Sequence, residues 1–490
     1  MKKALKYTTL AALAAFAAGA IPAYAETLYL DYTKTSSGSS QDITVPSIYT
    51  PEVTGITASD DLDLKYTVEG GTVFNTTKDF TVNDVTVSAT TSGKVWGHEF
   101  LNIGEGTTTT FNSLNYTLNA WGENPNTTIY LNEGSTFTVN KDIIYKAAAA
   151  AQNEINFFFM GTANSTLNVG GNIELLSPAK ATTNLNLQFN SYNVNIGGVI
   201  KLNNDAYMKR IQLDNGATDG TARTYNRSFG GLSVNKNGEL RIVGKANNTV
   251  NLTFTNSTEE SYSGYLMTKA DSTGNKFNIT MNAATAAGKQ TLRFLDATGK
   301  TGDGNTYNNA AIDNVSVSNG TLSLGMNSAM SANKLVVNGE KAVFDITSAD
   351  GTSEIGRATF GSFEGTKGAI AFDFAKEKDT RDFINITGTA NVSSDLAFIV
   401  NMTKADFDSF LGEGETSLQY NIISFTTEGS SFDATTVICS DSQLKGKIDL
   451  VDIAGTTSVM LTIAAVPEPA TVAAILGAVV LAFAAYRRRK

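Results

Sequence analysis

Apolar and polar residues alternate along most of the chain between residues 26 and 465. The alternation is most regular in segments 126–140, 184–189 and 250–254. A period of two residues places the apolar side chains on one face of a β-strand and the polar side chains on the other. The pattern therefore predicts many strands, in sheets that are buried on one side only.

Residues that favour tight turns separate these strands. Asparagine followed by glycine tolerates the positive φ angles that such turns need. These pairs are Asn215-Gly216, Asn237-Gly238, Asn319-Gly320 and Asn338-Gly339. Proline cannot donate a hydrogen bond to a neighbouring strand, and after Pro51 the ectodomain contains only Pro125 and Pro178. We therefore expect long, uninterrupted hydrogen-bond ladders.

A repeat is present within this pattern. Residues 167–175 (LNVGGNIEL) and 194–202 (VNIGGVIKL) share their apolar phase and both glycines, and looser copies occur at 232–242, 315–324 and 335–346. One such unit cannot bury its apolar face alone, whereas stacked units share a continuous core. We therefore expect an all-β, elongated β-solenoid with coils of roughly 20–40 residues. An array of β-sandwiches is the structural alternative.

Three segments depart from the strand pattern. The alanine-rich segments 146–152 and 281–290 predict short helices or loops, and 405–411 predicts a short helix. Towards the C-terminal end the strands become longer and more apolar, which indicates a better-packed section that closes the solenoid. We therefore divide the ectodomain into a repetitive β-solenoid, 26–358, and a C-terminal section, 359–465.

The N-terminus has the parts of a secretion signal. Three lysines within the first six residues precede an apolar run at 10–20. Small residues, Ala23 and Ala25, then occupy the two positions that a signal peptidase inspects. The apolar run is too short for a membrane span, which needs about 20 residues. We expect residues 1–25 to be a cleaved signal peptide and the mature chain to begin at Glu26.

The C-terminus carries a second apolar run, 470–486, followed by the basic residues Arg487, Arg488, Arg489 and Lys490. A helix of about 17 residues spans roughly 26 Å, barely enough to cross a bilayer. Basic residues stay on the cytoplasmic side, so the ectodomain would lie outside. We expect a single C-terminal transmembrane helix.

A proline-flanked motif, Pro467, Glu468 and Pro469, precedes this apolar run. In the order of its parts, segment 466–490 resembles the PEP-CTERM sorting signal of Gram-negative bacteria. The resemblance implies that an exosortase, an integral-membrane enzyme similar to a transpeptidase, recognises the three motif residues and cleaves nearby. It also implies transient anchoring in the inner membrane, followed by transfer to the cell surface or to an extracellular polysaccharide matrix.

The ectodomain is similar to the passenger regions of autotransporters in its glycine-punctuated repeats and in segment 382–388 (DFINITG). Those passengers are right-handed β-helices, so the resemblance implies a right-handed solenoid. In that family an outer-membrane barrel follows the passenger, whereas a single predicted helix follows here. We therefore expect a different route of export.

The acidic composition limits the partners. Setting aside the seven basic residues at the two ends leaves 30 basic residues against 47 acidic ones, a net charge of about −17. Such a chain repels phosphate backbones, so we expect no nucleic-acid partner. The single cysteine, Cys439, cannot form an intrachain disulfide. It lies in an apolar run, which predicts a small buried residue.

Motifs of catalysis are incomplete throughout. The single histidine, His98, excludes His-rich zinc sites. The segment Gly299–Thr301 lacks the first glycine of a phosphate loop because Phe294 occupies that position. Ser331 and Lys334 match the SxxK pattern, but the other motifs of penicillin-binding enzymes are missing. We therefore expect no catalytic residues.

Two acidic segments leave calcium open as a cofactor. Asp60, Asp61 and Asp63 lie close together, and 303–305 begins like a calcium loop, although Tyr307 replaces the next oxygen ligand. Solvated carboxylates are the alternative in both places, and we otherwise expect no cofactor.

About fourteen Asn-x-Ser/Thr triplets, including those at Asn75, Asn115, Asn251 and Asn401, match the N-glycosylation pattern. We attribute their number to the abundance of asparagine and threonine.

The sequence therefore predicts an exported β-solenoid that acts as a structural or adhesive element at the cell surface or in the extracellular matrix. The expected partners are signal peptidase, exosortase, the inner membrane during sorting, and exopolysaccharide or surface glycans. Two alternatives stay open: a carbohydrate-active β-helix enzyme, such as a polysaccharide lyase or hydrolase, and a non-catalytic glycan-binding module.

Overall fold

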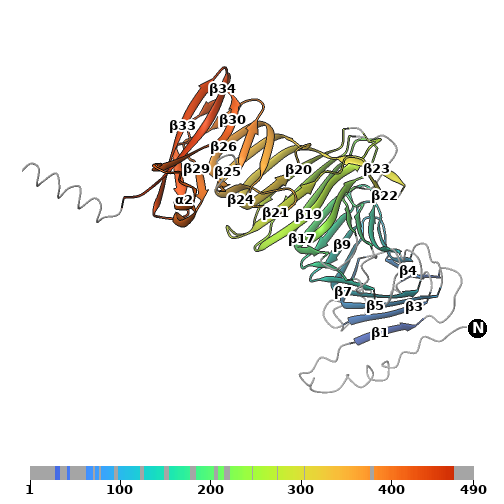
Figure 1. Ribbon diagram of the computed structural model, residues 1–490. Helices are drawn as coiled ribbons and strands as arrows, with labels where there is room; N and C mark the ends of the chain where they lie inside the picture. Colours follow the sequence, from blue (N-terminus) through green and yellow to red (C-terminus); the bar gives the residue numbers. More distant parts are fainter. Residues whose placement is uncertain are drawn as a thin grey trace, which may run out of the picture.

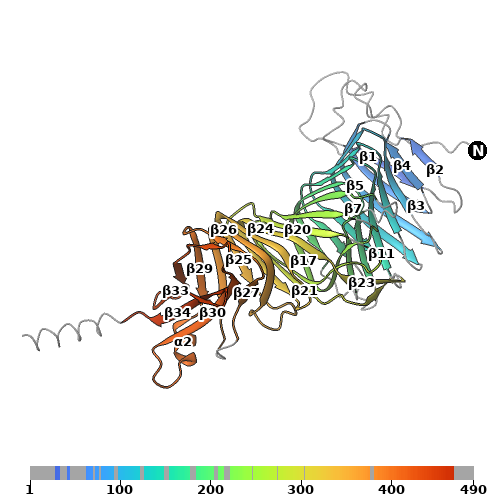
Figure 2. The same cartoon turned by 90° about the horizontal axis from the view of Figure 1, so that it is seen from above.

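A computed structural model describes residues 28–33, 41–44, 62–69, 72–76, 79–92, 98–121, 126–147, 154–176, 184–202, 208–214, 221–245, 247–272, 274–302, 304–375 and 380–467. These residues form 34 strands and one short helix. They wind into a β-solenoid of about nine turns, stacked from β1 at one end to β33 and β34 at the other (Figures 1 and 2). The predicted all-β class and solenoid are confirmed, while the right-handed sense of the coil stays a prediction.

The strands follow one another with short connections. The first third contains β1 (Leu28–Thr33), β2 (Gln41–Thr44), β3 (Leu62–Glu69), β4 (Thr72–Thr76), β5 (Phe80–Ser92), β6 (His98–Ile103), β7 (Thr108–Trp121), β8 (Asn126–Leu131), β9 (Thr136–Val139), β10 (Ile143–Ala147), β11 (Glu154–Gly161), β12 (Thr166–Val169) and β13 (Ile173–Leu176). The middle contains β14 (Asn184–Phe189), β15 (Asn193–Lys201), β16 (Lys209–Gln212), β17 (Thr224–Ile242), β18 (Thr249–Phe254), β19 (Glu259–Lys269), β20 (Lys276–Asn282), β21 (Lys289–Leu295), β22 (Lys300–Gly302), β23 (Asn305–Asn309), β24 (Ala311–Met326) and β25 (Ala332–Ile346). The last part contains β26 (Arg357–Asp373), β27 (Phe383–Ile386), β28 (Ala390–Val392), β29 (Leu396–Asn401), α2 (Lys404–Phe410), β30 (Ser417–Thr426), β31 (Ser431–Phe432), β32 (Thr436–Cys439), β33 (Leu444–Ile453) and β34 (Thr456–Ala465).

Most strands pair in parallel with the strand one coil later. β12, for example, lies between β9 and β15. Long strands pass through corners of the coil: β17 contributes residues 226–229 to one ladder and residues 238–241 to another. Continuous parallel ladders exclude the β-sandwich alternative for the described residues, because sandwiches are built from antiparallel sheets.

The two best repeat copies lie directly on each other. Leu167 pairs with Val194, and Ile173 pairs with Ile200. The shared glycines allow the corners to approach closely, since a Cβ atom on Gly197 would lie 2.7 Å from the carbonyl oxygen of Gly170. The repeat seen in the sequence is therefore one coil of the solenoid.

A continuous apolar core fills the coil from Phe80 to Ile463. It is built by the period-two alternation, as in β14, where every second side chain is buried. Aromatic rings stack between coils within it: Tyr145 lies 5.2 Å from Tyr116 and 4.7 Å from Phe157, measured between ring centres. The core therefore supplies the stability that disulfides cannot.

The segments that depart from the strand pattern are partly as expected. The helix α2 confirms the prediction at 405–411, and its N-cap Thr403 forms a capping box with Asp406. Residues 283–288 form the loop between β20 and β21. Of the segment 146–152, Ala147 ends β10 and the rest lies outside the described residues. Cys439 is half-buried against the core, and burial raises the pKa of its thiol.

The C-terminal end of the solenoid changes from parallel to antiparallel pairing. β26 crosses the expected division at residue 358, and the parallel ladders continue through β29 to β32. β34 then lies antiparallel between β30 and β33. This antiparallel sheet is hereafter the C-terminal cap.

Both predicted targeting segments lie almost entirely outside the described residues. Ala23 and Ala25 are outside, as are Glu468, Pro469 and the residues from 470 to 490, and Pro467 is the last residue described. Within the described ranges, no helix has the length and apolar character needed to cross a membrane. The signal peptide, the transmembrane helix and the sorting motif therefore stay predictions.

Candidate functional site

One sheet of the solenoid presents a regular uncharged surface, which we call the Asn/Thr face. Eight successive strands, β7, β9, β12, β15, β17, β18, β20 and β24, each contribute two outward side chains in register. The first row consists of Thr108, Thr136, Thr166, Asn193, Asn226, Asn251, Asn278 and Asn314. The second row consists of Thr110, Thr138, Asn168, Asn195, Ser228, Thr253, Thr280 and Ser316. All sixteen carry a hydroxyl or an amide, and none is charged.

The geometry of the face follows from the sheet. Adjacent strands lie about 4.8 Å apart, so eight strands extend for about 34 Å along the solenoid axis. The two rows are separated by two residues along each strand, or about 6.6 Å. All sixteen side chains are half-buried or exposed, so they form the outer surface. The face ends at β25, where Lys334 and Val336 continue the two rows.

Within the first row, five asparagines form a hydrogen-bonded ladder. The Nδ2 of Asn226 donates to Oδ1 of Asn193 at 3.1 Å, and Asn251 donates to Asn226 at 2.9 Å. Asn278 donates to Asn251 at 2.8 Å, and Asn314 donates to Asn278 at 3.0 Å. Each inner amide uses one N–H and one lone pair in the ladder. A second N–H and a second lone pair on each amide are available to an outside molecule.

The ladder changes the interpretation of the Asn-x-Ser/Thr triplets. Asn226, Asn251, Asn278 and Asn314 all begin such a triplet, and the Ser or Thr two residues later belongs to the second row. The triplets thus reflect a period-two strand with two polar outward positions. Sequence reasoning treated them as composition and missed their alignment, which a count of the spacing between coils could have revealed.

A second candidate is a cluster of three carboxyl groups at the ends of strands. Oxygen atoms of Asp345, Asp373 and Asp382 lie within 4.8 Å of one another. Asp345 is at the end of β25, Asp373 ends β26, and Asp382 precedes β27. Asp345 accepts a hydrogen bond from the hydroxyl of Ser323. Sequence reasoning missed this cluster because its members come from separate coils.

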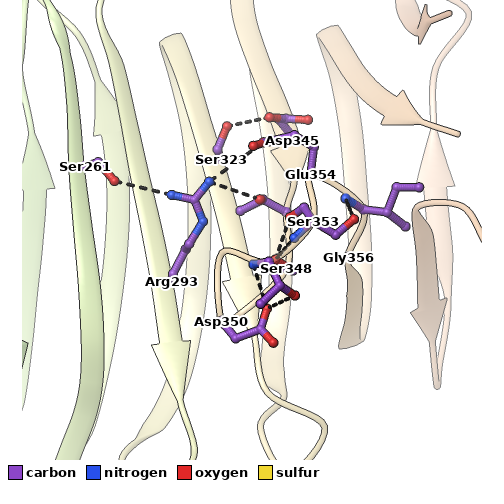
Figure 3. Close-up of polar contacts among 12 residues, drawn as sticks. Ser261, Arg293, Ser323, Asp345, Ser348, Asp350, Ser353, Glu354 and Gly356 are labelled. Carbon is purple, nitrogen blue, oxygen red and sulfur yellow. Dashed lines mark hydrogen bonds and ion pairs between the residues drawn. The ribbon is translucent and has the colours of Figure 1, made fainter. Parts of the chain in front are cut away.

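Basic and polar groups lie beside Asp345 (Figure 3). Arg293 projects from β21 towards the loop after β25, where its guanidinium lies 3.7 Å from a carboxylate oxygen of Glu354. The same side chain donates to the hydroxyl groups of Ser261 and Thr347, each at 3.4 Å. The cluster is therefore bordered by one cation that is already hydrogen-bonded.

Burial controls the protonation of the three acids. It raises the pKa of Asp382 to about 9 and that of Asp373 to about 6, and it also raises the pKa of Asp345. Neighbouring carboxylates add to the upward shifts of Asp382 and Asp373. Asp382 is therefore protonated at neutral pH.

The geometry gives Asp382 a structural role. Asp382 is fully buried, and its two carboxyl oxygens accept hydrogen bonds from the backbone N–H groups of Gly356 at 2.7 Å and Asp373 at 2.6 Å. Three ionised carboxylates could hold a divalent cation, but a neutral, fully bonded Asp382 is a poor ligand. The cluster is suited to fixing the turn between β26 and β27.

A third polar group is buried beneath the β22–β23 hairpin. Glu239 is 1% exposed and forms ion pairs with Arg210 at 3.1 Å, with Arg241, and with Lys300 at 3.7 Å. The ammonium of Lys300 also lies 3.7 Å from the ring centre of Tyr265. These contacts attach the hairpin to the coil.

The structure explains why the incomplete motifs are not sites. Lys300 and Thr301 belong to β22, so the segment is a hairpin strand and not a phosphate loop. Lys334 lies in β25 and pairs with Glu364 at 2.5 Å. His98 begins β6, in register with Thr127.

The calcium candidates are only partly covered. Asp60, Asp61 and Asp303 lie outside the described residues, and Asp63 lies in β3. Asn305 begins β23, and Tyr307 in the same strand is buried and accepts a hydrogen bond from Arg241 at 3.0 Å.

Comparison with known proteins does not assign the chain to a family. No protein-family model and no curated protein sequence matches it.

Proposed function

We propose that the protein is an exported, non-enzymatic β-solenoid that acts as a structural or adhesive element at the cell surface or in the extracellular matrix, with neutral glycans as its partners. The Asn/Thr face is the observation that carries the proposal. A long, uncharged surface with spare donors and acceptors at a constant spacing suits a polymer of hydroxyl-bearing sugars better than a charged partner.

Charge supports the same choice. The ectodomain is acidic, yet the sixteen side chains of the Asn/Thr face are neutral. An anionic polymer would be repelled by the molecule as a whole, whereas a neutral one is not. Hydrogen bonds to sugar hydroxyls replace hydrogen bonds to water, so each contact adds little. Affinity would come from many contacts along the 34 Å that the face spans at about 4.8 Å per strand.

The proposal of export depends on the sequence of the two ends. A signal peptide at 1–25 and a sorting segment at 466–490 would direct the ectodomain across the inner membrane. Signal peptidase would act after Ala25, and an exosortase would act near Pro467, Glu468 and Pro469. A β-solenoid with a closed apolar core and no disulfides suits this route, because its stability does not require oxidation.

The experiment is a polysaccharide panel tested for binding and for product release. We expect the mature protein to bind a subset of neutral glycans, and to release no product. Replacing Asn251 and Thr253 with aspartate should abolish binding through repulsion of water-stripped hydroxyl oxygens, whereas the same replacements at Thr86 and Asp433, which are exposed elsewhere, should not. Undiminished binding by the face variant would refute this site.

A carbohydrate-active enzyme is the second candidate, favoured by the carboxyl cluster at Asp345, Asp373 and Asp382. Two carboxyl groups with different pKa values are the usual acid and base of glycoside hydrolysis. Sustained product release that disappears in Asp345→Asn or Asp373→Asn would establish this candidate and remove the non-enzymatic proposal. Complete burial of Asp382 argues against its contact with a substrate.

A further inference from the structure

Exposed apolar residues gather at one end of the molecule. Among the described side chains, the large apolar residues that are exposed are Ile438, Leu450, Val451, Ile453 and Val466. All five belong to β32, to the C-terminal cap or to the residue that follows it. Three of them are in the second half of β33, where Ile453 is 68% exposed. The rest of the described surface is polar, so this apolar patch is a distinct feature.

β33 is also an edge strand. In the described part of the chain it pairs with β34 alone. Its closest approach to β32 is at Gly446, where a Cβ atom would lie 2.3 Å from the side chain of Val437. Beyond that point the strand has a row of N–H and C=O groups along its other edge. Such an edge is a template for another strand, and proteins usually protect it with charges or proline.

The charges of β33 are arranged in two halves of opposite sign. Lys445 and Lys447 lie in the first half, and Asp449 and Asp452 lie in the second half. All four side chains are exposed. When such a strand pairs antiparallel with a second copy of itself, the basic half of each copy faces the acidic half of the other. Parallel pairing would instead place like charges together.

Symmetry restricts the register of this pairing. A two-fold axis perpendicular to the sheet keeps each residue on its own face, so only residues separated by an even number of positions can face each other. With Ile448 opposite Ile448 of the copy, Lys447 faces Asp449 of the copy, and Val451 faces Lys445. A shift by one such step in either direction places Asp449 opposite Asp449 or Lys447 opposite Lys447.

We propose that the free edge of β33 is a homodimer interface, in which two copies of this chain pair antiparallel about Ile448. Leu450 then faces Gly446 of the copy, where the Val437 side chain supplies an apolar neighbour. The apolar half of each strand is covered, and both edges gain a hydrogen-bonding partner. The interface is small, so the dimer forms and dissociates in solution. This proposal does not depend on glycan binding.

The test is sedimentation velocity of the purified full chain over a range of concentrations. We expect a monomer–dimer equilibrium. Lys447→Asp and Asp449→Lys should each be monomeric alone, because each places like charges opposite one another, but an equimolar mixture should form a heterodimer. Both variants lose the exposed Lys447–Asp449 ion pair within the chain, so a heterodimer cannot be explained by that pair.

Further variants separate the edge from general stickiness. Val451→Lys should weaken dimerisation by about tenfold, since it faces Lys445 of the copy. Ile438→Lys is the matched control, because Ile438 is 50% exposed but lies outside β33, and it should dimerise like the wild type. A wild type that stays monomeric, single variants that still dimerise, or a mixture that stays monomeric would each overturn the proposal. Circular dichroism of every variant identifies any that fail to fold, and the double variant Lys447→Asp/Asp449→Lys, which restores both pairs, should dimerise.

Discussion

The asparagine ladder predicts a specific loss of stability at Asn278. This residue donates to Asn251 and accepts from Asn314, so Asn278→Ala removes two hydrogen bonds. A hydrogen bond in a folded protein contributes about 0.5–1.5 kcal/mol, which gives a loss of about 1–3 kcal/mol in the free energy of unfolding. Asn193 only accepts one ladder bond, from Asn226. Asn193→Ala should therefore cost about half as much.

Asn278→Asp separates the ladder from simple loss of an amide. An ionised carboxylate at this position would face the Oδ1 atom of Asn251, which lies 2.8 Å from the present Nδ2. Asn251 can avoid this only by rotating its amide, which turns its own oxygen towards Asn226. The protonated acid can donate, so the folded state favours it and raises the pKa of residue 278. The variant should lose stability, relative to the wild type, as pH rises through about 4 and above.

Urea unfolding followed by far-ultraviolet circular dichroism measures these differences. The wild type, Asn278→Ala, Asn193→Ala and Asn278→Asp should be compared at pH 4 and pH 7. Equal stabilities for Asn278→Ala and Asn193→Ala, or an aspartate variant whose deficit does not grow with pH, would refute the ladder as a source of stability.

Three further predictions concern other parts of the fold. Glu239→Gln leaves Arg210 and Arg241 short of a buried counter-charge and should cost about 3–5 kcal/mol in urea unfolding, whereas a cost near zero would show that the ion pairs are not buried. Gly230→Ala should prevent stable folding, monitored by protease resistance, because its Cβ would lie 2.0 Å from the carbonyl oxygen of Gly197; a variant as resistant as the wild type would contradict the packing. The raised pKa of Asp382, about 9, means that the folded state holds this proton more tightly than the unfolded state, so its contribution to stability is present below pH 4 and is lost as pH rises towards 9. Asp382→Asn should flatten that pH dependence, and an unchanged slope would exclude Asp382 as its source.

The fold could be predicted from local pattern, because alternation and glycine corners are properties of neighbouring residues. The copies at 167–175 and 194–202 already defined one coil, and their register is found in the structure. The short helix at 405–411 had its own capping signal at Thr403.

The candidate sites could not be predicted in the same way, because each combines residues from separate coils. The five ladder asparagines are spread from 193 to 314, and the coils differ in length, so no fixed spacing aligns them. The carboxyl cluster depends on where β25 and β26 end. Cys439 was expected to be buried, but it is only half-buried because β32 is at the end of the parallel stack.

The most direct test of the proposed function is an intact-mass measurement on native protein recovered from the cell surface. The account predicts a chain that begins at Glu26 and that has lost the apolar run and basic residues of segment 466–490. Full-length protein with both ends intact, recovered in solution from inside the cell, would contradict export, sorting and the surface role together.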